Sequence, residues 1–300
     1  MKVLKYLIAG IITVVIILKI PAAGSSAAPE TTLAYHLATN AIARTNGFTA
    51  GFYDLLEFTA PWCTNTLQIE RFTNAVWSQK FWLKNVIGLS ATPIGFTNVF
   101  GGQGLPTMVS PRHYLCATHM HCESYTIAFL DTNNMTHWRK VLQRLDVTND
   151  TTVGILDQDL PPSVGFLPVL SPSYTNYLPT ANNSIVQGIG MNQDFCLFSE
   201  PMNFSSPNAV LWNSGLNVPG GLGTNWNVTI RGGDSSNPAL LLIGQQLVLV
   251  SHNAFVSGGP NYAFLIAPIN EAMHQLSKKN HVRSDYQLTE FSLTNWPAVR

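Results

Sequence analysis

The feature that most constrains the fold is the pattern after Ile87, where short apolar runs alternate with Gly, Pro, Asn and Ser. The clearest runs are TMVSPRHYLCATH, SYTIAFLD, TTVGILD, VGFLPVL, AVLWNSG, ALLLIG and QQLVLVSH. Repeated short strands with turn residues between them are typical of an all-β sandwich or barrel. The later run APINEAMHQLSKK has helical spacing and lysines in its last turn, which predicts a C-terminal helix.

Two segments of another kind precede this β-rich region. The chain begins with two early lysines, an apolar run from Leu7 to Leu18 and the small-residue stretch AAGSSAA, which is the layout of a secretory signal peptide. The run is short for a membrane span, so we expect cleavage near Ala27, with an uncleaved anchor as the alternative. From about Glu30 to Val86, apolar residues recur at helical intervals, which predicts a mostly helical or irregular N-terminal extension.

Composition narrows the class of partner and the compartment. Charged residues make up 11% of the chain and the formal net charge is zero, which argues against electrostatic capture of nucleic acid or of an anionic membrane. With such a leader, the mature chain is expected outside the cytoplasm, secreted or in the cell envelope. In an oxidising compartment an even set of four cysteines can form two disulfides in any of three pairings. These are Cys63, Cys116, Cys122 and Cys196.

The segment RGGDSSNPALLLIGQQLVLVSH places a Gly-Asp-Ser turn immediately before a predicted β-hairpin. A serine on such a turn, at the mouth of a sheet, suits an acyl-transfer nucleophile, and backbone amides of the same turn can stabilise an oxyanion. Gly233 is the residue type that permits this close approach. Ser235 is therefore the predicted nucleophile, and the alternative is an ordinary surface turn.

A nucleophilic serine needs a base and an orienting carboxylate. His119 ends the apolar strand that begins at Met108, where the sheet can hold its ring rigidly. Asp150 lies directly before the apolar strand TTVGIL, from which it can accept the Nδ1 proton of His119. The order His, Asp, Ser is one of three that unrelated folds use for this constellation.

Other residues compete for these roles. His121 would point to the opposite face of an extended strand from His119. Asp146 is separated from the apolar strand by polar residues, and Asp157 lies at its far end. Zinc binding is a further alternative, because five zinc-type donors fall within ten residues, but it would leave the Gly-Asp-Ser turn unexplained. These donors are His113, Cys116, His119, His121 and Cys122.

These motifs resemble those of trypsin/chymotrypsin-like (S1) serine peptidases. SPRHYLCATH resembles the family's SPRHVLTAAH-type histidine stretch, NDTTVGILDQDLP is similar to its aspartate strand, and GGDSSNP resembles GDSGGP. The resemblance implies His119 as general base, Asp150 as its orienting group and Ser235 as nucleophile. It also implies an oxyanion hole formed by the amides of Gly233 and Ser235. The implied fold is two six-stranded antiparallel barrels with the site in the cleft between them.

The resemblance also implies a division of the chain and a substrate pocket. The expected parts are a signal peptide (1–27), an extension (28–86), a peptidase domain (87–279, with barrels at about 87–165 and 166–265 and then the helix) and a tail (280–300). The pocket would have Thr229 at its base, where a threonine offers no charge to recruit Lys or Arg. Its walls would be Ser251, His252, Asn253, Gly258 and Gly259.

The sequence departs from the family pattern at several positions. Ser236 and Asn237 stand where the family usually has two glycines, and Met120 stands where a cysteine normally follows the histidine. A bridge from Cys116 to Cys122 would span that histidine. There is no basic residue followed by an Ile-Val-Gly-Gly-like segment, so Asp234 needs a partner other than a new N-terminus.

The predicted function is that of a secreted serine endopeptidase acting on protein or peptide substrates through an acyl-enzyme, with no cofactor and no metal. No nucleic acid is expected as a partner, and no membrane after removal of the leader. The alternative is a catalytically inactive homologue that serves as an extracellular binding module. A secreted β-rich lectin is a third option, and it would not bring His119, Asp150 and Ser235 together in space.

Overall fold

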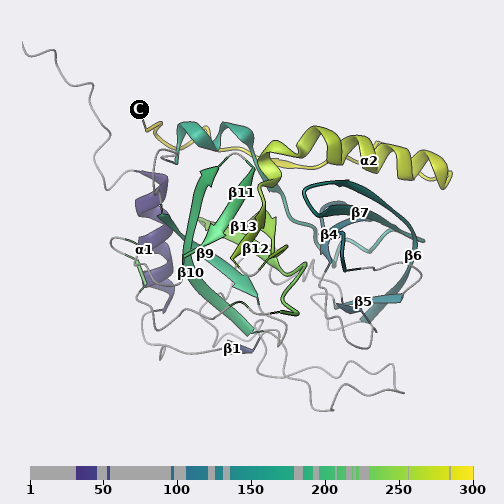
Figure 1. The fold of residues 1–300 in the computed structure, drawn as a ribbon, viewed down its shortest axis with the longest axis horizontal. Coiled ribbons are helices and arrows are strands. Elements are labelled where there is room, and N and C mark those ends of the chain that lie inside the picture. The colour runs from purple at the N-terminus through teal and green to yellow at the C-terminus, as the bar shows by residue number, and fades with distance from the viewer. Residues whose placement is uncertain are drawn as a thin grey trace, which may run out of the picture.

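A computed structural model provides the structure of this chain (Figure 1). It describes residues 32–45, 53–54, 96–97, 106–120, 126–130, 136–178, 185–191, 196–206, 208–213, 218, 221–222, 230, 232–255, 257–283 and 285–299. The predicted signal peptide, most of the N-terminal extension, Thr229, His121, Cys63 and Cys122 lie outside these residues.

The first sheet has six antiparallel strands in the order β2-β5-β6-β7-β4-β3. Every residue of β4 and β7 is buried, as expected for the apolar runs HYLCA and TTVGIL. The strands are β2 (Phe96–Thr97), β3 (Thr107–Met108), β4 (His113–Ala117), β5 (Thr126–Leu130), β6 (Thr136–Thr148) and β7 (Thr151–Leu156).

The second sheet has nine strands, with β1 paired to β10 beside the path β14-β11-β10-β9-β12-β13-β8-β15. Its pairs are antiparallel except those that β8 makes with β13 and β15, which are parallel. The strands are β1 (Tyr53–Asp54), β8 (Val169–Leu170), β9 (Ile185–Met191), β10 (Cys196–Ser206), β11 (Ala209–Trp212), β12 (Pro238–Ile243), β13 (Gln246–His252), β14 (Gly258–Pro260) and β15 (Glu290–Phe291).

Two α-helices and two short 3₁₀ helices complete the described fold. α1 (Leu33–Thr45) packs on β9 and β12, whereas α2 (Ile266–Lys279) leaves the second sheet and packs across β6 and β7 of the first (Figure 1). The buried positions of α2 recur every three or four residues, which is the spacing that predicted this helix. The 3₁₀ helices are η2 (Pro172–Asn176) and η4 (Tyr262–Phe264).

One hydrophobic cluster joins the two sheets. It combines side chains of β4 and β7, such as Leu115 and Val153, with Leu240 and Leu249 of β12 and β13, and with Ile269 of α2. Burial of apolar area is the main favourable term in such an interface. The sheets and α2 therefore form one packed unit, with loops from both sheets meeting at its edge.

Both flanking segments belong to the second sheet. Leu33 and Leu37 of α1 are buried in its core, and β15 from the predicted tail pairs with β8. The ring of Trp296 lies 4.5 Å from that of His36, so the tail also contacts α1. The second sheet has nine strands instead of the six expected, and two of the three additional strands, β1 and β15, come from the extension and the tail.

The predicted architecture is confirmed in its main features. The described chain is mostly β, forms two curled sheets and carries a C-terminal helix, as the resemblance to chymotrypsin-like peptidases implied. Among the described residues, no helix is long and apolar enough to cross a membrane.

Candidate active site

His119 lies just beyond the end of β4, where the first sheet stops. The amide of Thr118 donates to the carbonyl of Asp150 at 3.0 Å, which ties the end of β4 to the turn before β7. The side chain of His119 is 46% exposed. The sheet thus fixes the backbone while the imidazole stays accessible to a reactant.

Asp150 lies in the two-residue turn between β6 and β7. Thr148 and Thr151 pair across the hairpin, and the two turn residues, Asn149 and Asp150, have φ values of 49° and 57°. Two-residue hairpin turns favour positive φ at both central positions, and Asn and Asp tolerate that conformation better than most residues. This turn chemistry aims the Asp150 carboxylate back at the end of β4.

His119, Asp150 and Ser235 form a continuous chain of hydrogen bonds. The Asp150 carboxylate accepts from the backbone amide of His119 at 3.1 Å and lies 2.7 Å from the ring Nδ1. A carboxylate only accepts, so Nδ1 carries the hydrogen and the neutral ring has its lone pair at Nε2. Nε2 lies 2.8 Å from the Ser235 hydroxyl, in position to accept its proton.

The loop that carries Ser235 is a compact turn docked on the end of β13. Gly233 has a φ of 102°, a conformation that favours glycine. Asp234 is 1% exposed, so the turn rests on a buried carboxyl side chain. The predicted oxyanion role of the Gly233 and Ser235 amides stays a prediction.

Ser236 explains how the loop forms without the usual glycine. Its φ is 71°, so it adopts the left-handed conformation with a side chain present. The buried Ser236 hydroxyl accepts a hydrogen bond from the amide of Ala117 at 2.8 Å, and its own amide donates to the Asn253 carbonyl at 2.8 Å. The serine thus ties the Ser235 loop to β4, two residues before His119. Sequence reasoning treated Ser236 only as a departure and missed this contact.

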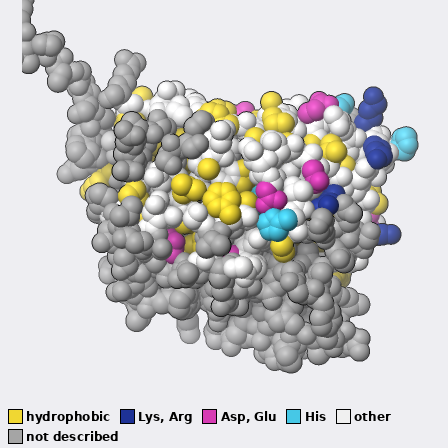
Figure 2. All heavy atoms as spheres, in the orientation of Figure 1, with side chains coloured by type: hydrophobic (Ala, Val, Ile, Leu, Met, Phe, Trp, Pro, Cys, Tyr) yellow, Lys and Arg dark blue, Asp and Glu magenta, His cyan; other side chains and the backbone are white. Residues whose placement is uncertain are grey.

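A cavity of about 380 Å³ lies beside Asp150. Its lining is mostly uncharged and comes from the β6–β7 turn and from the segments around β14. The lining residues are Asn149, Asp150, Asn208, Ala254, Phe255, Gly259 and Pro260. Figure 2 shows one face of the molecule, on which hydrophobic side chains gather near the middle and Lys and Arg side chains at the right-hand end.

Of the residues predicted to form the pocket walls, some lie at this cavity and the others are buried in the interior. Gly259 lines the cavity, and Gly258 pairs with Phe255 next to it. Ser251, His252 and Asn253 are each at most 2% exposed and do not line it. The Asn253 side chain instead accepts from the indole of Trp212 at 2.9 Å.

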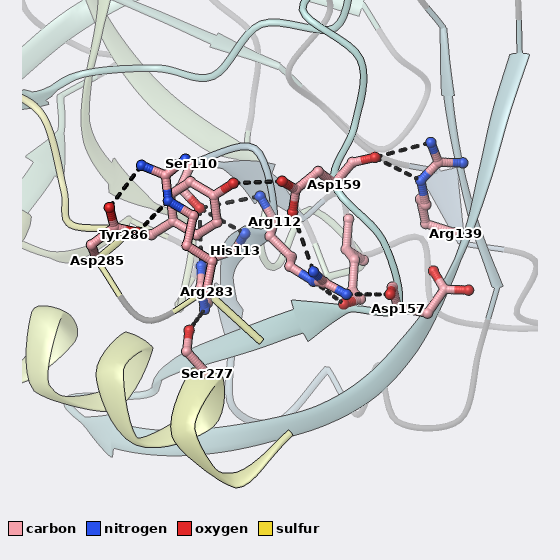
Figure 3. Close-up of polar contacts among 11 residues, drawn as sticks. Ser110, Arg112, His113, Arg139, Asp157, Asp159, Ser277, Arg283, Asp285 and Tyr286 are labelled. Carbon is pink, nitrogen blue, oxygen red and sulfur yellow. Dashed lines mark hydrogen bonds and ion pairs between the residues drawn. The ribbon is translucent and has the colours of Figure 1, made fainter. Parts of the chain in front are cut away.

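The rival residues have other partners. The Asp146 carboxylate accepts from the Thr152 hydroxyl at 2.5 Å, and that of Asp157 accepts from the Lys140 amide at 3.0 Å. His113 is buried between the hydroxyls of Ser110 and Ser277 (Figure 3). Within the described part of the chain no group of three or more His, Cys, Asp or Glu side chains could hold a metal ion.

Comparison with known proteins gives the following matches. No protein-family model and no curated protein matches the sequence. Among solved structures, human heparin binding protein matches with a TM-score of 0.43 and 13% identity, over 60% of this chain and 90% of that one. A mutant of human heparin binding protein matches with a TM-score of 0.41 and 14% identity over the same shares of the two chains.

Proposed function

We propose that this protein is an exported serine-type endopeptidase, with Ser235 as nucleophile, His119 as general base and Asp150 as the group that orients the base. The observation that carries the proposal is the hydrogen-bonded chain from the Asp150 carboxylate through both nitrogens of His119 to the Ser235 hydroxyl. If the Gly-Asp-Ser segment were only a surface turn, nothing would explain why a carboxylate, an imidazole and a hydroxyl form a hydrogen-bonded chain that ends on its serine.

The reaction follows from the donor and acceptor positions. His119 Nε2 accepts the Ser235 proton as the oxygen attacks a carbonyl carbon, and the resulting imidazolium is stabilised by Asp150. The imidazolium then donates this proton to the leaving amine as the C–N bond breaks, leaving an ester on Ser235. Water attacks the ester with the same histidine as base, which releases the acid and restores the hydroxyl.

The substrate class is a peptide with neutral side chains near the bond cleaved. Among the described residues, the lining of the cavity beside Asp150 has no cationic side chain, and its one carboxylate is hydrogen bonded to His119. Strict cleavage after arginine in a peptide library would contradict this preference.

Labelling with an uncharged fluorophosphonate tests the proposed nucleophile. We expect labelling of the wild type, none of Ser235→Ala, and a loss of at least about 100-fold in rate for His119→Ala, since the base is removed. Ser292→Ala and His274→Ala, which change exposed residues of the tail and α2, are the matched controls and should label normally. Absence of labelling in folded wild type would favour the inactive binding module.

A further inference from the structure

His252, at the end of β13, contacts the backbone of Asp150 from the other sheet. Its Nε2 lies 3.1 Å from the Asp150 carbonyl oxygen, and its Nδ1 is hydrogen bonded to the hydroxyl of Tyr262 in η4. Both side chains are buried, with His252 2% and Tyr262 0% exposed. The ring centroids are 5.5 Å apart.

The direction of each hydrogen bond follows from the groups present. A carbonyl only accepts, so His252 Nε2 carries the hydrogen, and in the neutral ring Nδ1 must then accept from the Tyr262 hydroxyl. Burial lowers the pKa of His252 to about 4, although the neighbouring Asp150 opposes this in part. Burial also raises the pKa of Tyr262 well above its ordinary value. A protonated phenol and a neutral imidazole therefore form a directional chain that ends on Asp150.

Hydrogen bonds to the Asp150 carbonyl connect three parts of the fold. It accepts from the amide of Thr118 after β4 and from His252 of β13, while it belongs to the β6–β7 turn. Positive φ at Asn149 and Asp150 is the preferred geometry of this two-residue turn, so the hydrogen bonds to the Asp150 carbonyl fix where the turn lies and not its local conformation. Only one of the two donors, His252, comes from the sheet that carries Ser235.

We propose that His252, oriented by Tyr262, is a positioning residue that holds the Asp150 turn in register with Ser235 across the junction of the two sheets. It acts through the Asp150 backbone and touches no reacting atom. Together with the Ser236–Ala117 hydrogen bond, this contact gives two direct links between the sheets close to His119. The inference rests on the proposed peptidase function and adds to it two residues outside the triad.

The test compares three variants of the full chain. His252→Phe removes both hydrogen bonds, His252→Gln retains one donor and one acceptor, and Tyr262→Phe removes only the hydroxyl that selects the tautomer. We expect His252→Phe to reduce the fluorophosphonate rate constant and kcat by about 10- to 100-fold, as for a small misplacement of a catalytic group, with little change in KM. His252→Gln should recover most of the rate, and Tyr262→Phe should fall between them.

A spectroscopic readout separates this proposal from the peptidase proposal. The hydrogen between His119 Nδ1 and the Asp150 carboxylate should give a strongly downfield proton resonance in the wild type, and His252→Phe should shift or broaden it while His252→Gln preserves it. This comparison holds even if the wild type neither labels nor cleaves peptides, a result that would count against the peptidase alone.

The matched control is His113→Phe, which changes another buried histidine that bonds two hydroxyl groups in the first sheet and α2. It should be destabilised yet keep the wild-type rate and resonance at a temperature where all variants are folded. A folded His252→Phe protein with wild-type rate and resonance would overturn the proposal. So would an equal loss in His113→Phe, because the effect would then reflect general destabilisation.

Discussion

Ser236 combines a strained backbone with a buried hydrogen bond, and the two effects can be separated by substitution. Ser236→Ala leaves the left-handed backbone and removes the acceptor of the Ala117 amide, which should cost about 1–3 kcal/mol of unfolding free energy. Ser236→Gly loses the same bond but relieves about 1–2 kcal/mol of backbone strain. We therefore expect Ser236→Gly to be the more stable of the two, as measured by urea denaturation. The reverse order would show that the strain is negligible.

Single residues also show how much of the candidate active site could be predicted from the sequence. His119, Asp150 and Ser235 were each predicted from a strand end or turn, and the structure brings all three together. The contact that His252 makes with Asp150 was not predicted, because the family resemblance assigned His252 to a pocket wall. A register shift between Ala239 and Leu240 interrupts the β12–β13 pairing, and such a shift changes which face each side chain occupies.

At the scale of elements, α1 is part of the second sheet's core rather than a separate extension. Leu37 is 3% exposed in that core, whereas Ile42 on the same helix is 42% exposed. Leu37→Ala should lower the free energy of unfolding by about 2–5 kcal/mol, because a buried side chain leaves a cavity. Ile42→Ala should change it by less than about 0.5 kcal/mol.

Denaturant unfolding of the two variants measures this difference. Equal and small effects would show that α1 does not contribute to the core, and a loss confined to α1 signals would show local unfolding. A further contact supports the predicted contribution of α1 to the core, since the Asn40 side chain on α1 donates to the Gly244 carbonyl in the β12–β13 turn at 2.9 Å.

Strands and helices differ in how well the sequence predicts them. β4, β7, β12 and β13 follow apolar runs bounded by turn residues, and α2 follows its periodic pattern, so all five elements were predicted. β15 was not predicted, and β8 covers only the last two residues of the predicted strand run VGFLPVL; both strands pair in parallel with distant segments. Local sequence contains no signal for such pairing.

At the scale of the whole molecule, buried histidines make stability depend on pH. His113 connects Ser110 near β4 to Ser277 of α2, and close by the Tyr286 hydroxyl donates to Asp159 at 2.5 Å (Figure 3). Burial, followed by the nearby Arg112, lowers the pKa of His113 to about 4 from 6.5. Between these values the unfolded chain binds a proton that the folded chain excludes, so stability falls as pH decreases from about 6.5 to 4.

His113→Gln removes a group that takes up a proton on unfolding between about pH 6.5 and 4. The slope of unfolding free energy against pH should then decrease by up to about 1.4 kcal/mol per pH unit between pH 6.5 and 4, with little change in slope above pH 7. Urea denaturation at a series of pH values measures both slopes. An unchanged slope below pH 6.5 would mean that His113 is protonated in the folded state.

The two-sheet architecture was predictable because strand texture and three ordered motifs agree with one another. How the two sheets pack against each other was harder to predict from the sequence, because it depends on contacts between residues far apart in the chain. Ser236 reaches Ala117 and His252 reaches Asp150 only once both sheets have folded. These contacts place one half of the site against the other, and no local pattern encodes them.

The most direct test of the central claim is the mass of the protein quenched in acid during turnover of an activated ester with a neutral acyl group. We predict the addition of one acyl group per chain, mapped by peptide mass spectrometry to Ser235 rather than to the adjacent Ser236, and absent from Ser235→Ala. An acyl group on another residue, or none on folded wild-type protein, would contradict the assignment of Ser235 as the nucleophile.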